Sequence, residues 1–280
     1  MKKIPAITLV LIGYAIAASQ FSARASVRLA QADSIAIDVK QGRQGSDNPL
    51  IWVQRPSLKN DPASGVGGGH SGDKNRCTAV RERLTALVPM KDEQSTLMQT
   101  AQTNPTFWFY IPYSAKLPAE FVLRNPQDTP DKPFYATPLV LPGKQGIVGI
   151  KLPSTKLLKL GVYRWKLQVR CDSRNPAADV YVNGAIERVQ PSANLIPPPK
   201  TAAEKRAILY AKDGLWSETL TTLLKEVRPK QPQVGTKMLT KLLGEYGLGN
   251  LAQQPIVLEQ VDAAGKLPNQ SPTRIKGAQW

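Results

Sequence analysis

Residues 161–171 read GVYRWKLQVRC, and this stretch decides the fold. Apolar or aromatic side chains alternate with polar ones, which is the period-two pattern of a strand with one buried and one solvated face. The expected buried face comprises Tyr163, Trp165, Leu167, Val169 and Cys171. The opposite, basic face carries Arg164, Lys166, Gln168 and Arg170. The pattern predicts a β-strand that ends at one of the two cysteines of the chain.

Short extended runs separated by Pro and Gly lie on both sides of this strand. They cover residues 84–88, 106–111, 119–124, 134–141, 146–152 and 179–189. About six to eight short strands at near-regular spacing are typical of an all-β sandwich. We therefore expect a mainly β fold, an immunoglobulin-like or related antiparallel β-sandwich, over residues 76–190. Val169 occupies the place of the immunoglobulin tyrosine corner, so the prediction concerns the architecture and not that family.

The first 25 residues have the pattern of a secretory signal peptide. Lys2 and Lys3 precede an apolar run over residues 4–18, and Ala23 and Ala25 form a small-residue cleavage site. The alternative is a membrane anchor, but the run is shorter than the ~20 residues that span a bilayer. We expect cleavage after Ala25, export to the periplasm or cell envelope, and no transmembrane anchor in the mature chain.

The segments that flank the sandwich differ from it in composition. Residues 26–75 are typical of a flexible linker, except for Leu50–Val53, which we expect to be a strand or a docking segment. Residues 191–250 are predicted to form a helical appendage packed on the sandwich. Residues 251–280 are predicted to be a loose C-terminal tail.

Two helix boundaries in the appendage are predicted from short motifs. Thr201-Ala202-Ala203-Glu204 has the pattern of a capping box and predicts that the first helix opens at Thr201. The second helix is predicted to end before Pro229.

The chain is strongly basic, with 37 Lys and Arg residues, 21 Asp and Glu residues and a formal net charge of +16. The excess is largest over residues 76–190, which carry 16 basic and 9 acidic side chains. In an intracellular protein this balance would suggest nucleic acid as a ligand. For an exported chain we expect no nucleic-acid partner, and an anionic lipid, an acidic glycan or an acidic protein is favoured. The alternative is a purely solubilising role for the charge.

Cys77 and Cys171 are the only cysteines of the chain. In an oxidising compartment two cysteines most simply pair with each other, and a Cys77–Cys171 disulfide would close a loop of about 95 residues. Two free buried thiols are the alternative. Cysteines this far apart offer no zinc-ligand cluster, so no metal site is predicted.

The sequence offers no catalytic constellation. His70 is the only histidine and lies in the Gly-rich residues 67–72, which satisfy G-x-G-x-x-G without a preceding strand or a following helix. A Ser-His-Asp triad is therefore not expected. Two carboxylate pairs lie in loops: Asp128 with Asp131, and Asp172 with Asp179. Such residues are commonly turn formers, so we predict a non-enzymatic chain with no catalytic residue and no cofactor.

The basic face of the central strand is a candidate anion-binding site. Arg164, Lys166 and Arg170 place three cations on one side of the strand, where alternate residues lie about 7 Å apart, and are suited to an anionic polymer or a layer of headgroups. The alternative is an ordinary solvated sheet face whose long cationic side chains cover apolar surface.

The aromatic strand is a candidate partner-binding site, carried by Phe107, Trp108, Phe109 and Tyr110. One alternate set of its side chains must face the core, and the other set is available to stack on a partner. The alternative is a central strand that is buried on both faces.

Several of these motifs, taken together, resemble a known family. They are Leu84–Pro89, Pro105–Pro112, Ala119–Arg124, Leu141–Gly143 with Gly146–Val148, Tyr163–Trp165 with Cys171, and Asp179–Val180 with Gly184 and Arg188. In this order they are similar to the cyanobacterial exported family catalogued as domain of unknown function 928. The resemblance implies export, a shared fold and a paired Cys77 and Cys171, but it brings no activity and no functional residue.

We therefore expect a non-catalytic periplasmic or envelope-associated module that binds a protein partner, most simply an envelope protein. The alternative is a module that binds an anionic envelope glycan or lipid through its basic strand face.

Overall fold

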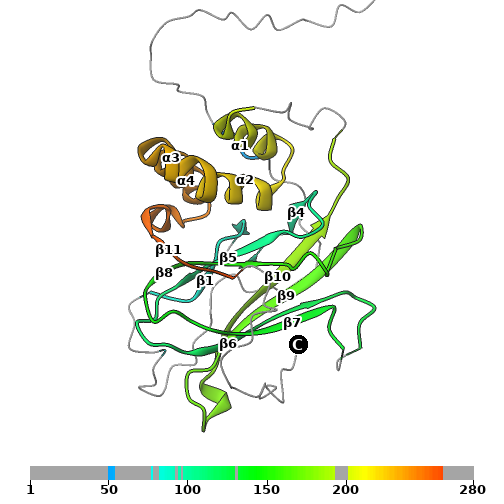
Figure 1. Ribbon diagram of the computed structural model, residues 1–280, viewed down its shortest axis with the longest axis vertical. Helices are drawn as coiled ribbons and strands as arrows, with labels where there is room; N and C mark the ends of the chain where they lie inside the picture. The colour runs from blue at the N-terminus through cyan, green and yellow to red at the C-terminus, as the bar shows by residue number, and fades with distance from the viewer. Residues whose placement is uncertain are drawn as a thin grey trace, which may run out of the picture. The chain divides into compact units, whose positions relative to one another are not determined.

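A computed structural model describes residues 50–53, 77, 82–91, 94–95, 97–129, 132–192 and 201–260. The predicted signal peptide, most of the linker-like segment and the chain beyond residue 260 lie outside the described residues. Within the described residues, no helix is long and apolar enough to cross a membrane. The fold is mainly β, with two sheets and a C-terminal helical segment (Figure 1), as the sequence predicts.

The larger sheet has five strands in the order β4-β10-β9-β6-β7. They are β4 (Met98–Thr100), β6 (Pro118–Arg124), β7 (Tyr135–Val140), β9 (Gly161–Val169) and β10 (Val180–Arg188). The middle strand, β9, is the strand predicted from the opening stretch, and it pairs antiparallel with β6 and β10. Edge strand β4 pairs in parallel with β10. The predicted inward side chains of β9, from Tyr163 to Val169, are all buried.

The smaller sheet has four strands in the order β1-β5-β8-β11. They are β1 (Thr85–Ala86), β5 (Thr106–Ile111), β8 (Gly146–Lys151) and β11 (Ile256–Gln260). Strand β5 pairs antiparallel with β1 and β8, whereas β11 pairs in parallel with β8. The start of the predicted tail therefore adds an edge strand to this sheet. A separate two-stranded hairpin joins β2 (Met90–Lys91) to β3 (Gln94–Ser95).

The two sheets contact each other through aromatic side chains. Phe107 and Phe109 of β5 meet Phe121 of β6 and Trp165 of β9, with ring centroids between 4.8 and 6.4 Å apart. Tilted and edge-on ring pairs of this kind stabilise a fold by about 0.5–1.5 kcal/mol each beyond the area they bury. The centre of the sandwich is therefore an aromatic cluster contributed by both sheets.

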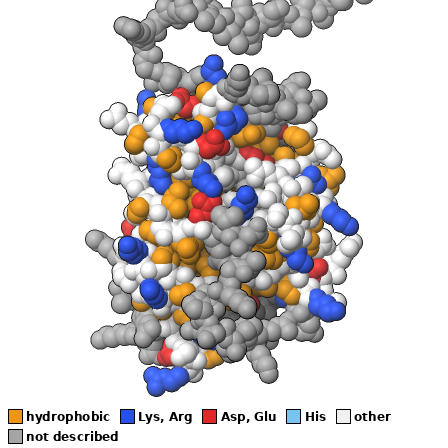
Figure 2. Space-filling view, in the orientation of Figure 1, with side chains coloured by type: hydrophobic (Ala, Val, Ile, Leu, Met, Phe, Trp, Pro, Cys, Tyr) orange, Lys and Arg blue, Asp and Glu red, His pale blue; other side chains and the backbone are white. Residues whose placement is uncertain are grey.

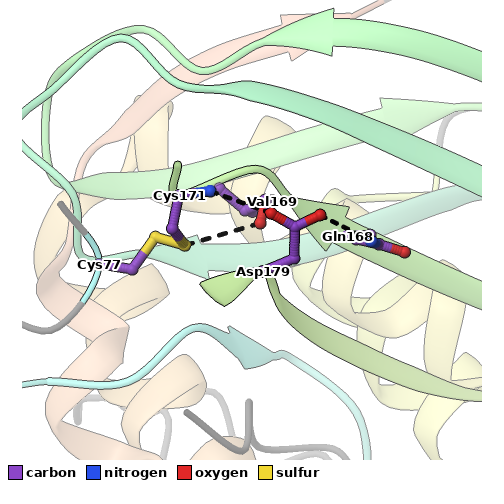
Figure 3. Close-up of a disulfide and its surroundings, with 5 residues drawn as sticks. All are labelled: Cys77, Gln168, Val169, Cys171 and Asp179. Carbon is purple, nitrogen blue, oxygen red and sulfur yellow. Dashed lines mark hydrogen bonds between the residues drawn. A yellow bond between two sulfur atoms is a disulfide. The ribbon is translucent and has the colours of Figure 1, made fainter. Parts of the chain in front are cut away.

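A disulfide joins Cys77 to Cys171, just beyond the end of β9 (Figure 3), and confirms the predicted pairing. The two Cα atoms lie 5.5 Å apart, which is an ordinary separation for a disulfide. Asp179 holds the adjacent turn. Its carboxylate accepts hydrogen bonds from the Cys171 N–H (3.3 Å) and from Nε2 of Gln168 (3.0 Å). The disulfide thus fixes the chain before the first sheet to the end of the central strand.

The helical segment contains six short elements. They are α1 (Ala203–Lys212), α2 (Trp216–Thr222), η3 (Leu223–Val227), α3 (Arg228–Lys230), α4 (Pro232–Gly244) and η4 (Gly249–Gln253). A further single turn, η1 (Pro176–Ala178), lies between β9 and β10. Figure 1 shows the helices on one side of the four-stranded sheet and the five-stranded sheet on its other side. The four-stranded sheet is therefore the middle layer.

Two helix boundaries differ from the predicted ones. Helix α1 begins at Ala203 instead of Thr201, and the residue before it, Ala202, makes no side-chain capping hydrogen bond. The second helix continues past Pro229 as α3, because a π-helical turn, η3, precedes the proline. The i→i+5 hydrogen bonding of such a turn accommodates a residue that lacks a backbone N–H.

The apolar island Leu50–Val53 docks on the helical segment. The Val53 N–H donates to the Ala211 carbonyl at 3.2 Å, and the Trp52 ring stands edge-on to Trp216 with centroids 4.9 Å apart. Of the two predicted alternatives, the docking segment is therefore confirmed.

Candidate functional site

The aromatic strand β5 is buried on both faces. Phe107, Trp108, Phe109 and Tyr110 are each between 1 and 3% exposed. Phe107 and Phe109 face the sandwich core. Trp108 contacts the helices, whereas the Tyr110 hydroxyl donates a hydrogen bond to the carboxylate of Glu82. The prediction that one set of these side chains is available to a protein partner is therefore wrong, and the alternative of a strand buried on both faces is confirmed. The helices that cover it come about 100 residues later in the chain.

Trp108 connects the middle sheet to the helical layer. Its Nε1 donates to Oγ1 of Thr221 at 2.9 Å. Gly149, directly opposite on β8, leaves room for the indole, because a Cβ there would lie 2.5 Å from Cζ3 of Trp108. A glycine inside a strand commonly marks such a close approach. The aromatic strand therefore has a partner, which is the chain's own helix.

Glu218 of α2 connects the helical layer to the end of β4, an edge strand of the five-stranded sheet. The side chain is 3% exposed, and its Oε1 accepts hydrogen bonds from Oγ1 of Thr100 (3.0 Å) and the N–H groups of Ala101 (2.7 Å) and Gln102 (3.0 Å). Burial raises the pKa of this carboxyl, and the three donors oppose the rise. All three hydrogen bonds end on Oε1, and Oε2 is buried without a hydrogen-bond partner among the described residues. We assign this carboxyl a structural role, because its Oε1 fixes the start of the β4–β5 connection.

The three cations of the predicted basic strand face differ in how far they are buried. Arg164 is exposed and Arg170 is half-buried, but Lys166 is only 6% exposed. Nζ of Lys166 lies 4.5 Å from the ring centroid of Tyr181 on the neighbouring strand, a cation–π contact. Burial lowers the pKa of Lys166, while the charges of Asp179 and Glu120 oppose this shift. The expectation that all three cations line one solvated face is therefore wrong at Lys166.

Exposed positive charge instead accompanies the loop that precedes β9. Lys156 and Lys159 are exposed, and Arg164 follows them near the start of the strand. Arg164 lies opposite Arg124 of β6 in the register of the sheet, so the two side chains occupy neighbouring positions on one face. Arg124 is half-buried, and its guanidinium donates a hydrogen bond to the Thr129 carbonyl at 3.0 Å. These four residues define what we call the basic end of the sandwich.

The loop of the basic end is anchored to the core. Leu152 and Leu158 are 1 and 2% exposed. The Leu158 N–H donates to the Thr103 carbonyl at 2.7 Å, and the Lys159 N–H donates to the Tyr163 hydroxyl at 3.0 Å. The two lysines are therefore presented on a fixed backbone, which reduces the entropy lost on binding.

The sequence contains a signal for the basic end that an analysis of strand periodicity does not detect. Residues 132–171 contain eight Lys or Arg residues and no Asp or Glu. Figure 2 shows Lys and Arg side chains spread over the visible face of the molecule, so net charge alone does not locate a site. The acid-free window does locate one, because it includes the loop and the strand that form the basic end.

The loop carboxylates that the structure describes hold turns. Asp128 accepts hydrogen bonds from the N–H groups of Asn125 (2.8 Å) and Phe134 (2.5 Å), and Asp172 accepts one from the N–H of Arg174 (2.9 Å). His70 and Asp131 lie outside the described residues. Among the residues that the structure does describe, no group of three His, Cys, Asp or Glu side chains is placed to hold a metal ion.

These features define a disulfide-bonded β-sandwich domain with a helical layer on one face and a basic end. Residues 66–256 match the family described as Domain of Unknown Function (DUF928). The match spans more than half of the chain, and the chain therefore belongs to this family, as its motifs predict. A comparison with curated proteins gave no match.

Proposed function

We propose that this protein is an exported, non-catalytic module of the cell envelope that binds an anionic surface through the basic end of its sandwich. The observation that supports the proposal is the placement of the exposed Lys156 and Lys159 on an anchored loop that leads into β9, the strand of Arg164. Cations grouped on one loop attract phosphate or carboxylate groups more strongly than the same charges spread over a surface. The N-terminal pattern of residues 1–25 and the disulfide support export.

A protein partner on the aromatic strand is no longer the favoured ligand, since the helices already occupy that strand. The ligand chemistry shared by the remaining candidates is a dense array of anionic oxygens. Lipid headgroups and acidic glycans both provide it, so the test must present them separately.

The test uses the protein as exported by its host, after mass spectrometry has established its N-terminus. Retention is measured on phosphatidylglycerol-containing vesicles, on phosphatidylcholine vesicles and on an acidic polysaccharide resin, at low and high salt. The variant K156E/K159E is compared with K205E/K230E, which makes the same change in net charge on exposed helical positions. A lysine near an anionic membrane contributes about 1 kcal/mol. The loop variant should therefore bind the anionic surface about 30-fold more weakly or worse, and the helix variant should bind like the wild type.

Two results would contradict the proposal. Equal weakening of the loop and helix variants would show that net charge and not the basic end determines binding. Retention that persists when salt shortens the Debye length from about 10 Å to about 3 Å would show that the interaction is not electrostatic.

A further inference from the structure

We propose that the anionic surface is a lipid bilayer, and that Leu157 and Leu160 insert into it between the headgroup-binding side chains of Lys156 and Lys159. This inference rests on the proposed function and names its ligand. The five residues Lys156–Leu160 read KLLKL, and we call them the insertion loop.

The insertion loop exposes apolar and cationic side chains together. Leu157 is 52% exposed and Leu160 is 51% exposed, while both lysines are exposed beside them. Between them, Leu158 is buried and holds the loop to the core. Leu157 and Lys159, on either side of the buried Leu158, are both exposed, so the loop presents them to solvent while Leu158 points into the protein.

The loop is stiffened by its neighbours on the adjoining connection. Nζ of Lys156 lies 5.7 Å from the ring centroid of Phe134, which itself stands edge-on to Tyr163 at 5.3 Å. The hydroxyl of Tyr163 accepts a hydrogen bond from the Lys159 N–H. These contacts hold the backbone of the loop in place, so the two leucines stay exposed to solvent.

The mixture of side chains favours a bilayer over the other anionic surfaces. A bilayer offers an anionic headgroup layer directly above hydrocarbon, which matches lysines flanking leucines. An acidic glycan offers anionic groups but no hydrocarbon for the leucines. The cores of protein interfaces are depleted in lysine, and leucine is under-represented among the residues that dominate their binding energy. Charge complementarity and apolar exposure thus agree only for lipid.

The expected effect of the leucines follows from their exposed area. About half of the surface of each leucine is exposed and can be buried in the bilayer. Burying both therefore corresponds to burying about one complete leucine side chain. Replacing both by serine is expected to weaken binding to anionic vesicles about 10- to 100-fold. The salt dependence of the residual binding should be unchanged, because the lysines remain.

The test is insertion into a lipid monolayer, combined with vesicle sedimentation. The exported protein and the variants L157S/L160S and K156E/K159E are injected beneath a phosphatidylglycerol-containing monolayer, and the rise in surface pressure is recorded. The control is V140S, which removes an apolar side chain that is 37% exposed on edge strand β7. Far-UV circular dichroism and thermal unfolding establish that every variant is folded. Wild type and V140S should raise the pressure equally, and L157S/L160S should bind weakly without raising it.

The remaining outcomes show whether the insertion proposal fails alone or together with the proposed function. If K156E/K159E loses vesicle binding while L157S/L160S keeps wild-type affinity and pressure rise, insertion is refuted and the proposed function stands. Binding to the acidic resin but not to vesicles also refutes insertion alone. Concentration-dependent association of the wild type that L157S/L160S abolishes, without vesicle binding, would assign the leucines to a second copy of the chain. Absence of binding to any anionic surface would refute both the inference and the proposed function.

Discussion

Replacing Glu218 by alanine is expected to lower the free energy of unfolding by about 2–4 kcal/mol. The carboxylate accepts hydrogen bonds from Thr100, Ala101 and Gln102 in the β4–β5 connection. The Gln102 N–H retains a second acceptor, Oγ1 of Thr100 at 3.1 Å. The variant therefore leaves the Ala101 N–H and the buried Thr100 hydroxyl without this acceptor. An unpaired buried donor costs about 1–3 kcal/mol, and relief of the buried carboxylate offsets part of the sum.

The glutamine variant separates hydrogen bonding from charge at this position. A glutamine Oε1 accepts the same three hydrogen bonds without a charge, but its NH2 group replaces the Oε2 atom that is buried without a partner among the described residues. E218Q is therefore expected to lose at most about 1–3 kcal/mol at neutral pH, the cost of one unpaired buried donor. Because burial raises the pKa of Glu218, the folded protein binds this proton more tightly than the unfolded chain does. Wild-type stability is therefore expected to decrease as the pH rises from the unfolded value of about 4.3 through the raised folded pKa. E218Q should lack this decrease.

Urea unfolding, followed by tryptophan fluorescence over a series of pH values, measures both effects. The m-value must stay constant for the comparison to report stability alone. The reasoning is refuted if E218A loses less than about 1 kcal/mol, the smallest cost of one unpaired buried donor. It is also refuted if the difference in stability between E218Q and the wild type does not change with pH.

Two further perturbations test the packing of the helices and the disulfide. Within α4, a Cβ on Gly235 would lie 2.4 Å from Cα of Arg228, whereas a Cβ on Gly244 would meet nothing within 4 Å. G235A is therefore expected to destabilise the protein by about 1–3 kcal/mol or more, and its control G244A to stabilise it by up to about 1 kcal/mol, in thermal or urea unfolding. C77S/C171S is expected to lose about 2–5 kcal/mol because the disulfide closes a loop across a sequence separation of 94 residues. A double serine variant with unchanged unfolding behaviour would contradict this estimate.

The parts of the fold that depend on local pattern are predictable from the sequence. The alternation in residues 161–171 predicts the central strand and its inward side chains, because a period of two reports one buried face directly. The pairing of Cys77 with Cys171 follows from the cysteine count once export is expected. The helix boundaries that differ from the prediction also have local causes. They depend on backbone details that residue types do not indicate, such as the π-helical turn before Pro229.

The parts that depend on contacts between distant segments are not predictable in this way. Lys166 alternates correctly into the polar face, yet Tyr181 on the next strand covers it, and only the strand register brings the two together. The Trp108 indole donates a hydrogen bond to Thr221, which is 113 positions away in the chain. Periodicity shows that one side of a strand is apolar, but an aromatic strand that is apolar on both sides gives no indication of what covers the second side. The prediction that one face of the aromatic strand is available to a partner is wrong for this reason.

The burial of the aromatic strand also bears on where function should be sought in this family. The residues that carry the family resemblance most specifically, Pro105–Pro112, lie between the sandwich core and the helices, and the family match extends over both layers. Such a motif is constrained by packing on two sides, so in this chain it reports the layered architecture and not a ligand. Residues that recognise a ligand must instead reach solvent. In the part of this chain that the structure describes, the insertion loop combines exposed leucines with exposed lysines on an anchored backbone. Substitutions in the insertion loop are therefore expected to change retention on anionic surfaces, whereas substitutions in the aromatic motif are expected to lower the free energy of unfolding.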